Sequence, residues 1–410
     1  MTPYNLCHME RIRNLSTSLC ERLGIRYPIL LAGMGLKGRA TPPELVAAVS
    51  NAGGLGVMGA SWTSPEEVRR RIRRVRELTQ QPFGVDLLLP TSLDETAVPD
   101  WEAMRELIRR EHPRHTELMR SIMERNQLPA VSAPQGQVLA PSAIRDCVAV
   151  VLEERVPVFA AALGDPAWMV PEAHRLGITV MGLAGSLRHA TRQREAGVDY
   201  VIAQGSEAGG HTGTIPSLVL WPQVVDSVRP LPVVAAGGIG DGRAIAAALA
   251  LGCVGAWVGT AFLLASECGI HDAHKDQIVA GRSEEFVVTR AYTGKTGRDY
   301  RNELIRLWDE SGLEPLPMPL QSLLLEDLLT AAEAAGRFDL INNPAGQVAG
   351  MLSAVRPARV IFDDLVDGAI EAIGSVATMA AMAVPGGATP SRGGTALRGL
   401  GVLPSERRSD

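Results

Sequence analysis

One histidine of the chain stands in a glycine-rich run that is suited to proton transfer. The run QGSEAGGHTG, residues 204–213, follows directly on a short apolar segment. Its adjacent glycines, Gly209 and Gly210, allow the backbone to lie flat against a ligand. An imidazole titrates near neutral pH and can both accept and donate a proton. We therefore expect His211 to carry acid–base chemistry at a site that this loop builds.

Two later segments combine glycine with a short apolar run in a way that indicates an anion site. They are Ala236-Gly237-Gly238-Ile239 and Val258-Gly259-Thr260. Glycine lets backbone N–H groups approach an anion, and in (β/α)8 barrels the loops after the seventh and eighth strands commonly bind phosphate. These segments predict a phosphorylated cofactor or substrate. The alternative is that the glycines only shape tight turns.

Other kinds of catalytic site fit the sequence poorly. No HxH, HExxH or acidic cluster accompanies His211, so no metal is expected. Ser206 and Cys253 lack an elbow motif and an evident partner base, although a partner far away in sequence can lie close in space. The five cysteines form no CxxC pair, which is typical of reduced thiols. Six further histidines are expected to be structural or solvated: His112, His115, His174, His189, His271 and His274.

The elements that must position these residues follow a βα pattern. From Tyr27 onward, short runs rich in Val, Ile and Leu alternate with longer segments of helical period. Eight such strands are better explained by a closed barrel than by an open doubly wound sheet. The sequence therefore predicts an α/β fold, a (β/α)8 TIM barrel. The expected strands are 28–34, 55–60, 82–89, 156–163, 178–184, 200–205, 232–238 and 255–262.

Two regions depart from the simple repeat. An insertion, 90–141, follows the third strand, and because βα loops lie at the C-terminal face it is expected to be a lid or a helical hairpin without a function. We predict a barrel over 1–282, a mostly helical accessory region over 283–385 that caps it, and a disordered tail over 386–410.

Composition limits the classes of function. The length of 410 residues and the 46% of hydrophobic residues predict a globular protein. The formal net charge of −5 indicates that it binds no nucleic acid. The N-terminus lacks the apolar segment of a signal peptide, so a cytoplasmic location is expected. The uncharged run 244–266 could span a membrane by length, but its order predicts a buried helix and then a buried strand. A homo-oligomer is an open possibility.

Several motifs taken in order resemble the nitronate monooxygenase family, whose members are FMN-containing barrels. The motifs are YPILLAGMG, SNAGGLGVMGAS, PFGVDLLLP, AQGSEAGGHTG, VVAAGGIGDGRAIAAALALG and VGTAFLLASE, and the resemblance covers residues 21–360. It implies that FMN is the cofactor and that His211 is catalytic. It further implies a small-molecule nitronate that is oxidised by O2 to a carbonyl compound and nitrite. The implied cofactor-binding residues are Ala32, Gly33, Met34, Asp86 and Gln204 at the ring and Gly209, Gly237, Gly238, Trp257, Val258, Gly259 and Thr260 at the ribityl phosphate.

The resemblance leaves alternatives open. The family often has proline where Gly33 stands and asparagine where Asp86 stands, and an acidic side chain there either alters the flavin's electronics or points elsewhere. NAD(P)H-dependent flavin enoyl-thioester reductases and related acyl-CoA-processing flavoenzymes carry a similar GGH motif. A flavin- or phosphate-binding barrel that acts as a sensor or scaffold without turnover is the third alternative.

Overall fold

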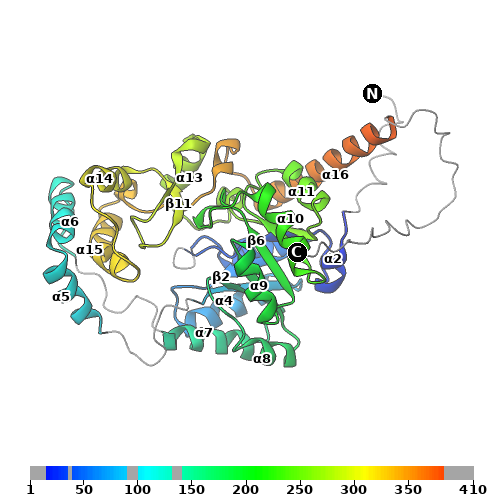
Figure 1. The fold of residues 1–410 in the computed structure, drawn as a ribbon, viewed down its shortest axis with the longest axis horizontal. Helices are drawn as coiled ribbons and strands as arrows, with labels where there is room; N and C mark the ends of the chain where they lie inside the picture. The colour runs from blue at the N-terminus through cyan, green and yellow to red at the C-terminus, as the bar shows by residue number, and fades with distance from the viewer. Residues whose placement is uncertain (1–14, 36–38, 90–99, 132–140, 383–410) are drawn as a thin grey trace, which may run out of the picture. The chain divides into compact units, whose positions relative to one another are not determined.

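The computed structural model describes residues 15–35, 39–89, 100–131 and 141–382 of the chain (Figure 1). As far as Ala372 these residues form one compact unit, and a second unit begins at Ile373. The predicted tail over 386–410 lies outside the described residues.

Eight parallel strands form the centre of the first unit. In space they run in the order β1-β9-β8-β6-β5-β4-β3-β2, and a bridge between Leu30 and Leu55 joins the two ends of this sheet. The predicted (β/α)8 barrel is therefore confirmed, and each expected strand contains an observed one. The strands are β1 (Ile29–Leu31), β2 (Gly56–Gly59), β3 (Phe83–Leu88), β4 (Val158–Ala162), β5 (Thr179–Ala184), β6 (Tyr200–Gln204), β8 (Val233–Ala236) and β9 (Gly255–Val258).

Side chains point alternately to the two faces of each strand, and this alternation gives two separate apolar cores. Inward-facing side chains such as Val57, Ile202 and Trp257 fill the barrel, and the short helix α2 (Ser18–Leu23) packs against them at one end. Outward-facing side chains pack against the surrounding helices, as in other barrels buried on both faces. These helices are α3 (Pro43–Asn51), α4 (Pro65–Leu78), α7 (Pro141–Glu153), α8 (Val170–Arg175), α9 (Leu187–Glu195), α10 (Ser217–Val228), α11 (Gly242–Ala250) and α12 (Thr260–Leu263).

The uncharged run 244–266 is resolved as the sequence predicts, into helix α11 followed by strand β9. The expected strand 255–262 is too long, because the chain turns at Gly259 and forms α12 from Thr260. In the part of the chain that the structure describes, no helix is both long enough and apolar enough to cross a membrane.

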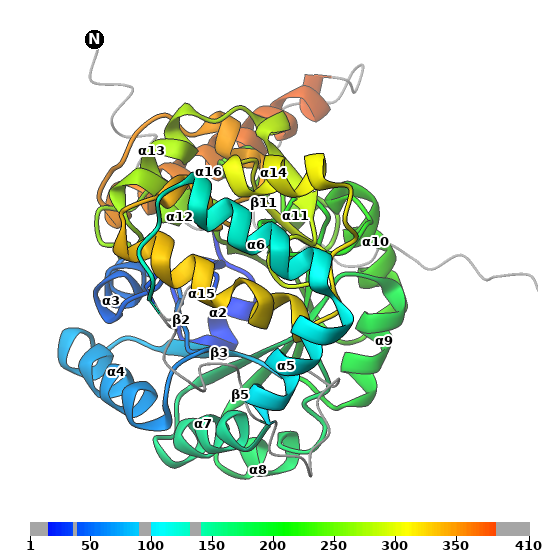
Figure 2. The same cartoon turned by 90° about the vertical axis from the view of Figure 1, so that its left-hand side faces the viewer.

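The insertion after β3 contributes two described helices, α5 (Trp101–Glu111) and α6 (Pro113–Arg125). Both pack on α15 (Leu320–Ala334) of the accessory region (Figures 1 and 2). Met119 and Ile122 of α6 share an apolar cluster with Leu325 and Leu328 of α15. The described part of the insertion therefore packs against the accessory region through α15.

The accessory region contains helices. It also contains one β-hairpin, which the sequence did not predict. The hairpin strands β10 (Phe286–Thr289) and β11 (Gly297–Tyr300) are antiparallel, and β11 also pairs with β7 (Gly210–His211), which belongs to the histidine loop. The accessory region is thus bonded directly to the glycine-rich run after β6. Its other elements are η1 (Ser283–Glu285), α14 (Glu303–Ser311), α15, η2 (Phe338–Leu340), η3 (Gln347–Met351) and α16 (Ala358–Met382), and α13 (Asp272–Ala280) precedes it.

Candidate active site

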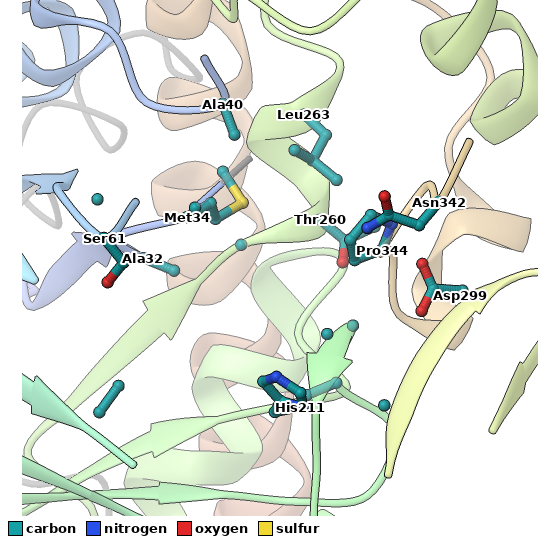
Figure 3. A pocket seen from close by; sticks show the side chains of 18 of the residues that line it. Ala32, Met34, Ala40, Ser61, His211, Thr260, Leu263, Asp299, Asn342 and Pro344 are labelled. Carbon is teal, nitrogen blue, oxygen red and sulfur yellow. The ribbon is translucent and has the colours of Figure 1, made fainter. Parts of the chain in front are cut away.

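A cavity of about 520 Å³ opens at the carboxyl ends of the barrel strands. Barrel loops line one side of the cavity, and the accessory region lines the other (Figure 3). The structure brings twelve of the thirteen predicted site residues to this cavity: Ala32, Gly33, Met34, Asp86, Gln204, Gly209, His211, Gly237, Gly238, Trp257, Gly259 and Thr260.

Val258 is the exception. Its side chain is fully buried and belongs to the layer between the strands and the helices, because alternation along β9 turns it away from the inward-facing Trp257. Its carbonyl oxygen accepts a hydrogen bond from the N–H of Ala32 at 2.9 Å. The side chain of Val258 therefore does not line the cavity, and its assignment to the cofactor site stays a prediction.

The histidine loop is held in place by strand pairing and by a side-chain hydrogen bond. His211 lies opposite Gly297 of β11, and the side-chain amide Nε2 of Gln204 donates a hydrogen bond of 2.7 Å to the His211 carbonyl. Gly210 has a φ of 69°, a left-handed conformation that glycine adopts without strain. A Cβ atom on Gly209 would lie 2.5 Å from the carbonyl carbon of Ala345, so only glycine fits there. Gly210 is thus favoured by its backbone conformation, and Gly209 is required by the close approach of Ala345.

Two charged groups, the buried Arg298 and the half-buried Glu207, stiffen the same loop. The guanidinium of Arg298, which is 7% exposed, donates to the carbonyl of Ser206 at 2.8 and 3.2 Å and also to the carbonyl of Phe286. The carboxylate of Glu207 accepts hydrogen bonds from the Ser217 N–H, at 2.9 and 3.1 Å, and from the Ser217 hydroxyl at 2.9 Å. These contacts connect the loop to the hairpin and to α10.

The environment of His211 favours a neutral ring with a defined tautomer. Nδ1 lies 3.2 Å from the carbonyl oxygen of Thr296, which can only accept, so Nδ1 carries the proton. Burial lowers the pKa of His211 below its ordinary value, and the charge of Lys295 lowers it further, while the Thr296 bond opposes both effects. Nε2 has no protein partner among the described residues, and the ring lines the cavity. The geometry therefore presents a free lone pair on Nε2.

The glycine loops after β8 and β9 line the cavity with backbone and no bulky side chain at Gly237, Gly238 and Gly259. Gly237 and Gly238 have positive φ, at 85° and 68°. Cβ atoms on Gly238 and Gly259 would make ordinary van der Waals contacts, the nearest at 3.6 and 3.5 Å, and both glycines line the cavity. The hydroxyl of Thr260 accepts the N–H of Gly346 at 2.9 Å, which leaves its own proton for an acceptor. These residues fit a phosphate group.

The floor of the cavity is formed by inward-facing groups at the ends of β1 and β3. Thr41 fixes the loop after β1, because its hydroxyl donates to the Met34 carbonyl at 3.1 Å and accepts the Gly59 N–H at 2.8 Å. Asp86 is 5% exposed, and its Oδ1 is buried without a hydrogen-bond partner among the described residues. An apolar floor with one unsatisfied polar atom fits a flat heteroaromatic ring that supplies the missing partner.

Sequence reasoning missed the cavity residues that α13 and the accessory region supply. Asp299 of β11 is 6% exposed, and burial raises its pKa to about 7. His271 and His274, which we expected to be structural or solvated, also line the cavity, and burial lowers the pKa of His274 to about 4. No local motif marks these positions, because they reach the cavity only through the hairpin and α13. Lys295 and Asn342 belong to the same wall.

Comparison with known proteins places this cavity in context. The family described as nitronate monooxygenase matches residues 16–368. Rv1533 of Mycobacterium tuberculosis, a monooxygenase by its given name, is 38% identical over 88% of this chain and 98% of its own. A nitroalkane oxidase from Streptomyces ansochromogenes is similar in structure, with a TM-score of 0.74 and 30% identity over 87% of this chain and 99% of its own. FabK from Thermotoga maritima has a TM-score of 0.69 and 30% identity over 88% and 99%.

Proposed function

The chain belongs to the nitronate monooxygenase family, and on that premise we propose that it oxidises alkyl nitronates with O2 to a carbonyl compound and nitrite, using bound FMN. One observation carries the proposal. A histidine with a fixed tautomer and a free Nε2 lies in a cavity whose glycine loops fit a phosphate and whose floor fits a flat ring.

The residues that would hold FMN come from two sets. Ala32, Gly33 and Met34 form the floor for the ring, and the Gly237, Gly238, Gly259 and Thr260 loops would bind the phosphate through backbone N–H groups. When bound, FMN supplies the electron transfer and the reaction with O2. The protein contributes binding, orientation and a proton acceptor.

His211 acts on the proton of the carbon that bears the nitro group. A neutral nitroalkane must lose this proton to become a nitronate, and Nε2 is the acceptor that the cavity offers. Since burial keeps the pKa of His211 below its ordinary value, the ring is neutral and ready to accept at pH 7. A nitronate that arrives already ionised needs no such step.

The accessory wall positions the substrate and limits water. Hairpin β10–β11 and helices α13 and α15 complete the cavity on the side opposite the barrel, and the Arg298 contacts hold this wall to the histidine loop. Substrate placed between this wall and the barrel would lie beside His211.

Product analysis tests the proposal. The purified protein should be incubated with an alkyl nitronate in air, and O2 uptake, nitrite and the carbonyl product should be measured together. We expect nitrite and carbonyl product to form in equal amounts while O2 is consumed, and heat-inactivated protein serves as the control. Protein that contains FMN but releases no nitrite above this control would refute the proposed reaction.

Reduction of an enoyl thioester by NAD(P)H on the same flavin is the second candidate. The likeness to FabK from Thermotoga maritima, at 30% identity, favours it. Here His211 would stand beside the acyl group and would again exchange a proton through Nε2. Oxidation of NADPH that depends on an enoyl thioester, without nitrite formation from nitronates, would select this candidate.

A further inference from the structure

Asp86 is a buried acid for which the proposed mechanism has no role. It lies in β3 between Gly59 of β2 and Ala160 of β4, on the inward-facing side of the barrel. Its side chain lines the cavity and is 5% exposed. No described residue donates a hydrogen bond to Oδ1, which is fully buried. A buried polar atom of this kind requires an explanation.

Gly33 holds this carboxyl group against the cavity. A Cβ atom on residue 33 would lie 2.2 Å from the Asp86 Cβ and 2.9 Å from Oδ2, so any other residue would displace the acid. The loop after β1 can therefore approach the carboxyl group closely only because it carries glycine there. The acid is part of the cavity floor and not a side chain that swings into solvent.

Among the residues that the structure describes, the elements packed around Asp86 bring no counter-charge to it. β2 contributes Gly59, β4 contributes Ala160, and the loop after β1 contributes Gly33 and Met34. Arg71 of α4 directs its guanidinium to the carbonyls of Gly59 and Thr41, at 3.1 and 2.8 Å.

Two other titratable groups of the cavity, His211 and Asp299, come from elements other than β3. His211 lies on the loop after β6, and Asp299 lies on the accessory wall. Burial alone raises the pKa of Asp86 to about 8.

We propose that Asp86 is a proton-linked ligand of the flavin, which binds the ring as a neutral carboxylic acid. This inference rests on the proposed FMN cofactor. An ionised carboxylate covered by the ring would lose its remaining water without gaining a cation from the described residues, which is strongly unfavourable. The neutral acid can instead donate its O–H to an acceptor atom of the ring. The buried, unpartnered Oδ1 favours the neutral form of the acid, and the part of Asp86 that reaches the cavity becomes a donor when the ring is bound.

Proton linkage fixes the expected dependence on pH. Below the pKa of the free acid, Asp86 is already protonated and FMN binding is independent of its titration. Above this pKa, each binding event takes up one proton, so the Kd for FMN rises up to about tenfold per pH unit. The dependence disappears if residue 86 cannot ionise.

Three forms of the apoprotein test the inference: the wild type, Asp86→Asn and Asp299→Asn. Asp86→Asn keeps the shape and removes the titration, and Asp299→Asn makes the same change at the other buried acid of the cavity. The Kd for FMN is measured by quenching of flavin fluorescence from about pH 6.5 to about pH 9.5. Proton uptake is measured at about pH 9 by calorimetry in two buffers of different ionisation enthalpy. The ionisations of FMN itself are common to all three proteins.

We expect the Kd to rise about tenfold in the last pH unit for the wild type and for Asp299→Asn, with proton uptake, and to remain within about twofold for Asp86→Asn. Equal pH profiles for the wild type and Asp86→Asn, with FMN bound to both, would overturn the role of Asp86 and leave the proposed function intact. Failure of all three proteins to bind FMN would overturn the cofactor, and the inference with it.

Discussion

Replacing His211 with asparagine separates proton abstraction from the oxidation that follows it. Asparagine can still donate a hydrogen bond to the Thr296 carbonyl, but it has no basic nitrogen to replace Nε2. Loss of a positioned general base costs about 10²–10⁴ in rate, or about 3–5 kcal/mol. We therefore expect kcat/KM for a neutral nitroalkane to fall by this factor. For a preformed nitronate, which has no proton to lose, it should change by less than about tenfold.

The assay is nitrite release from the two forms of one nitro compound, measured across pH. Because only the neutral ring accepts a proton, kcat/KM for the nitroalkane should be constant near pH 7 and fall below the pKa of His211, which burial places under its ordinary value of 6.5. His211→Asn should lack this acidic limb. His189→Asn, an exposed histidine on α9, is the matched control and should behave as the wild type. Equal losses for nitroalkane and nitronate, or loss of FMN from the variant, would refute the acid–base role.

Three further changes test the construction of the site. In Lys295→Met, removing the positive charge should raise the pKa of His211 and move the acidic limb to higher pH, and an unmoved limb would show that Lys295 does not act on the ring. Arg298→Met leaves two carbonyls without their buried donor, so we expect about 3 kcal/mol lower stability in urea unfolding and faster proteolysis of the histidine loop, whereas unchanged stability would contradict this role. In Gly209→Ala the new Cβ must displace the backbone of Ala345, so FMN affinity should fall by more than about tenfold, and unaltered binding measured by fluorescence would show that the contact yields.

The barrel could be predicted because its signal is local and repeated. Each strand is a short apolar run. These runs alternate with helices that end at glycine, so the βα units can be recognised one after another along the chain. The histidine loop and the glycine loops could be located for the same reason, since they follow these strands directly. Val258 adjoins Trp257 and Gly259 in sequence, but alternation turns its side chain to the opposite face, so adjacency in sequence could not tell which of these side chains line the cavity.

The accessory wall could not be predicted in this way. Strand β11 is the segment GRDY, which has no apolar alternation, and it becomes a strand through its pairing with β10 and β7. Thr296 and Asp299 enter the site with it, so their roles depend on a tertiary contact across more than eighty residues of sequence from His211. Residue types and spacing carry no trace of such a contact.

Anaerobic mixing shows which compound gives electrons to the flavin of this protein. The purified protein, with its flavin oxidised, is mixed without O2 with an alkyl nitronate and, separately, with NADH and NADPH, and the flavin absorbance is followed in time. The account predicts rapid loss of the oxidised flavin spectrum with the nitronate and no comparable change with either pyridine nucleotide. Rapid reduction by NADH or NADPH, together with no reduction by the nitronate, would contradict it.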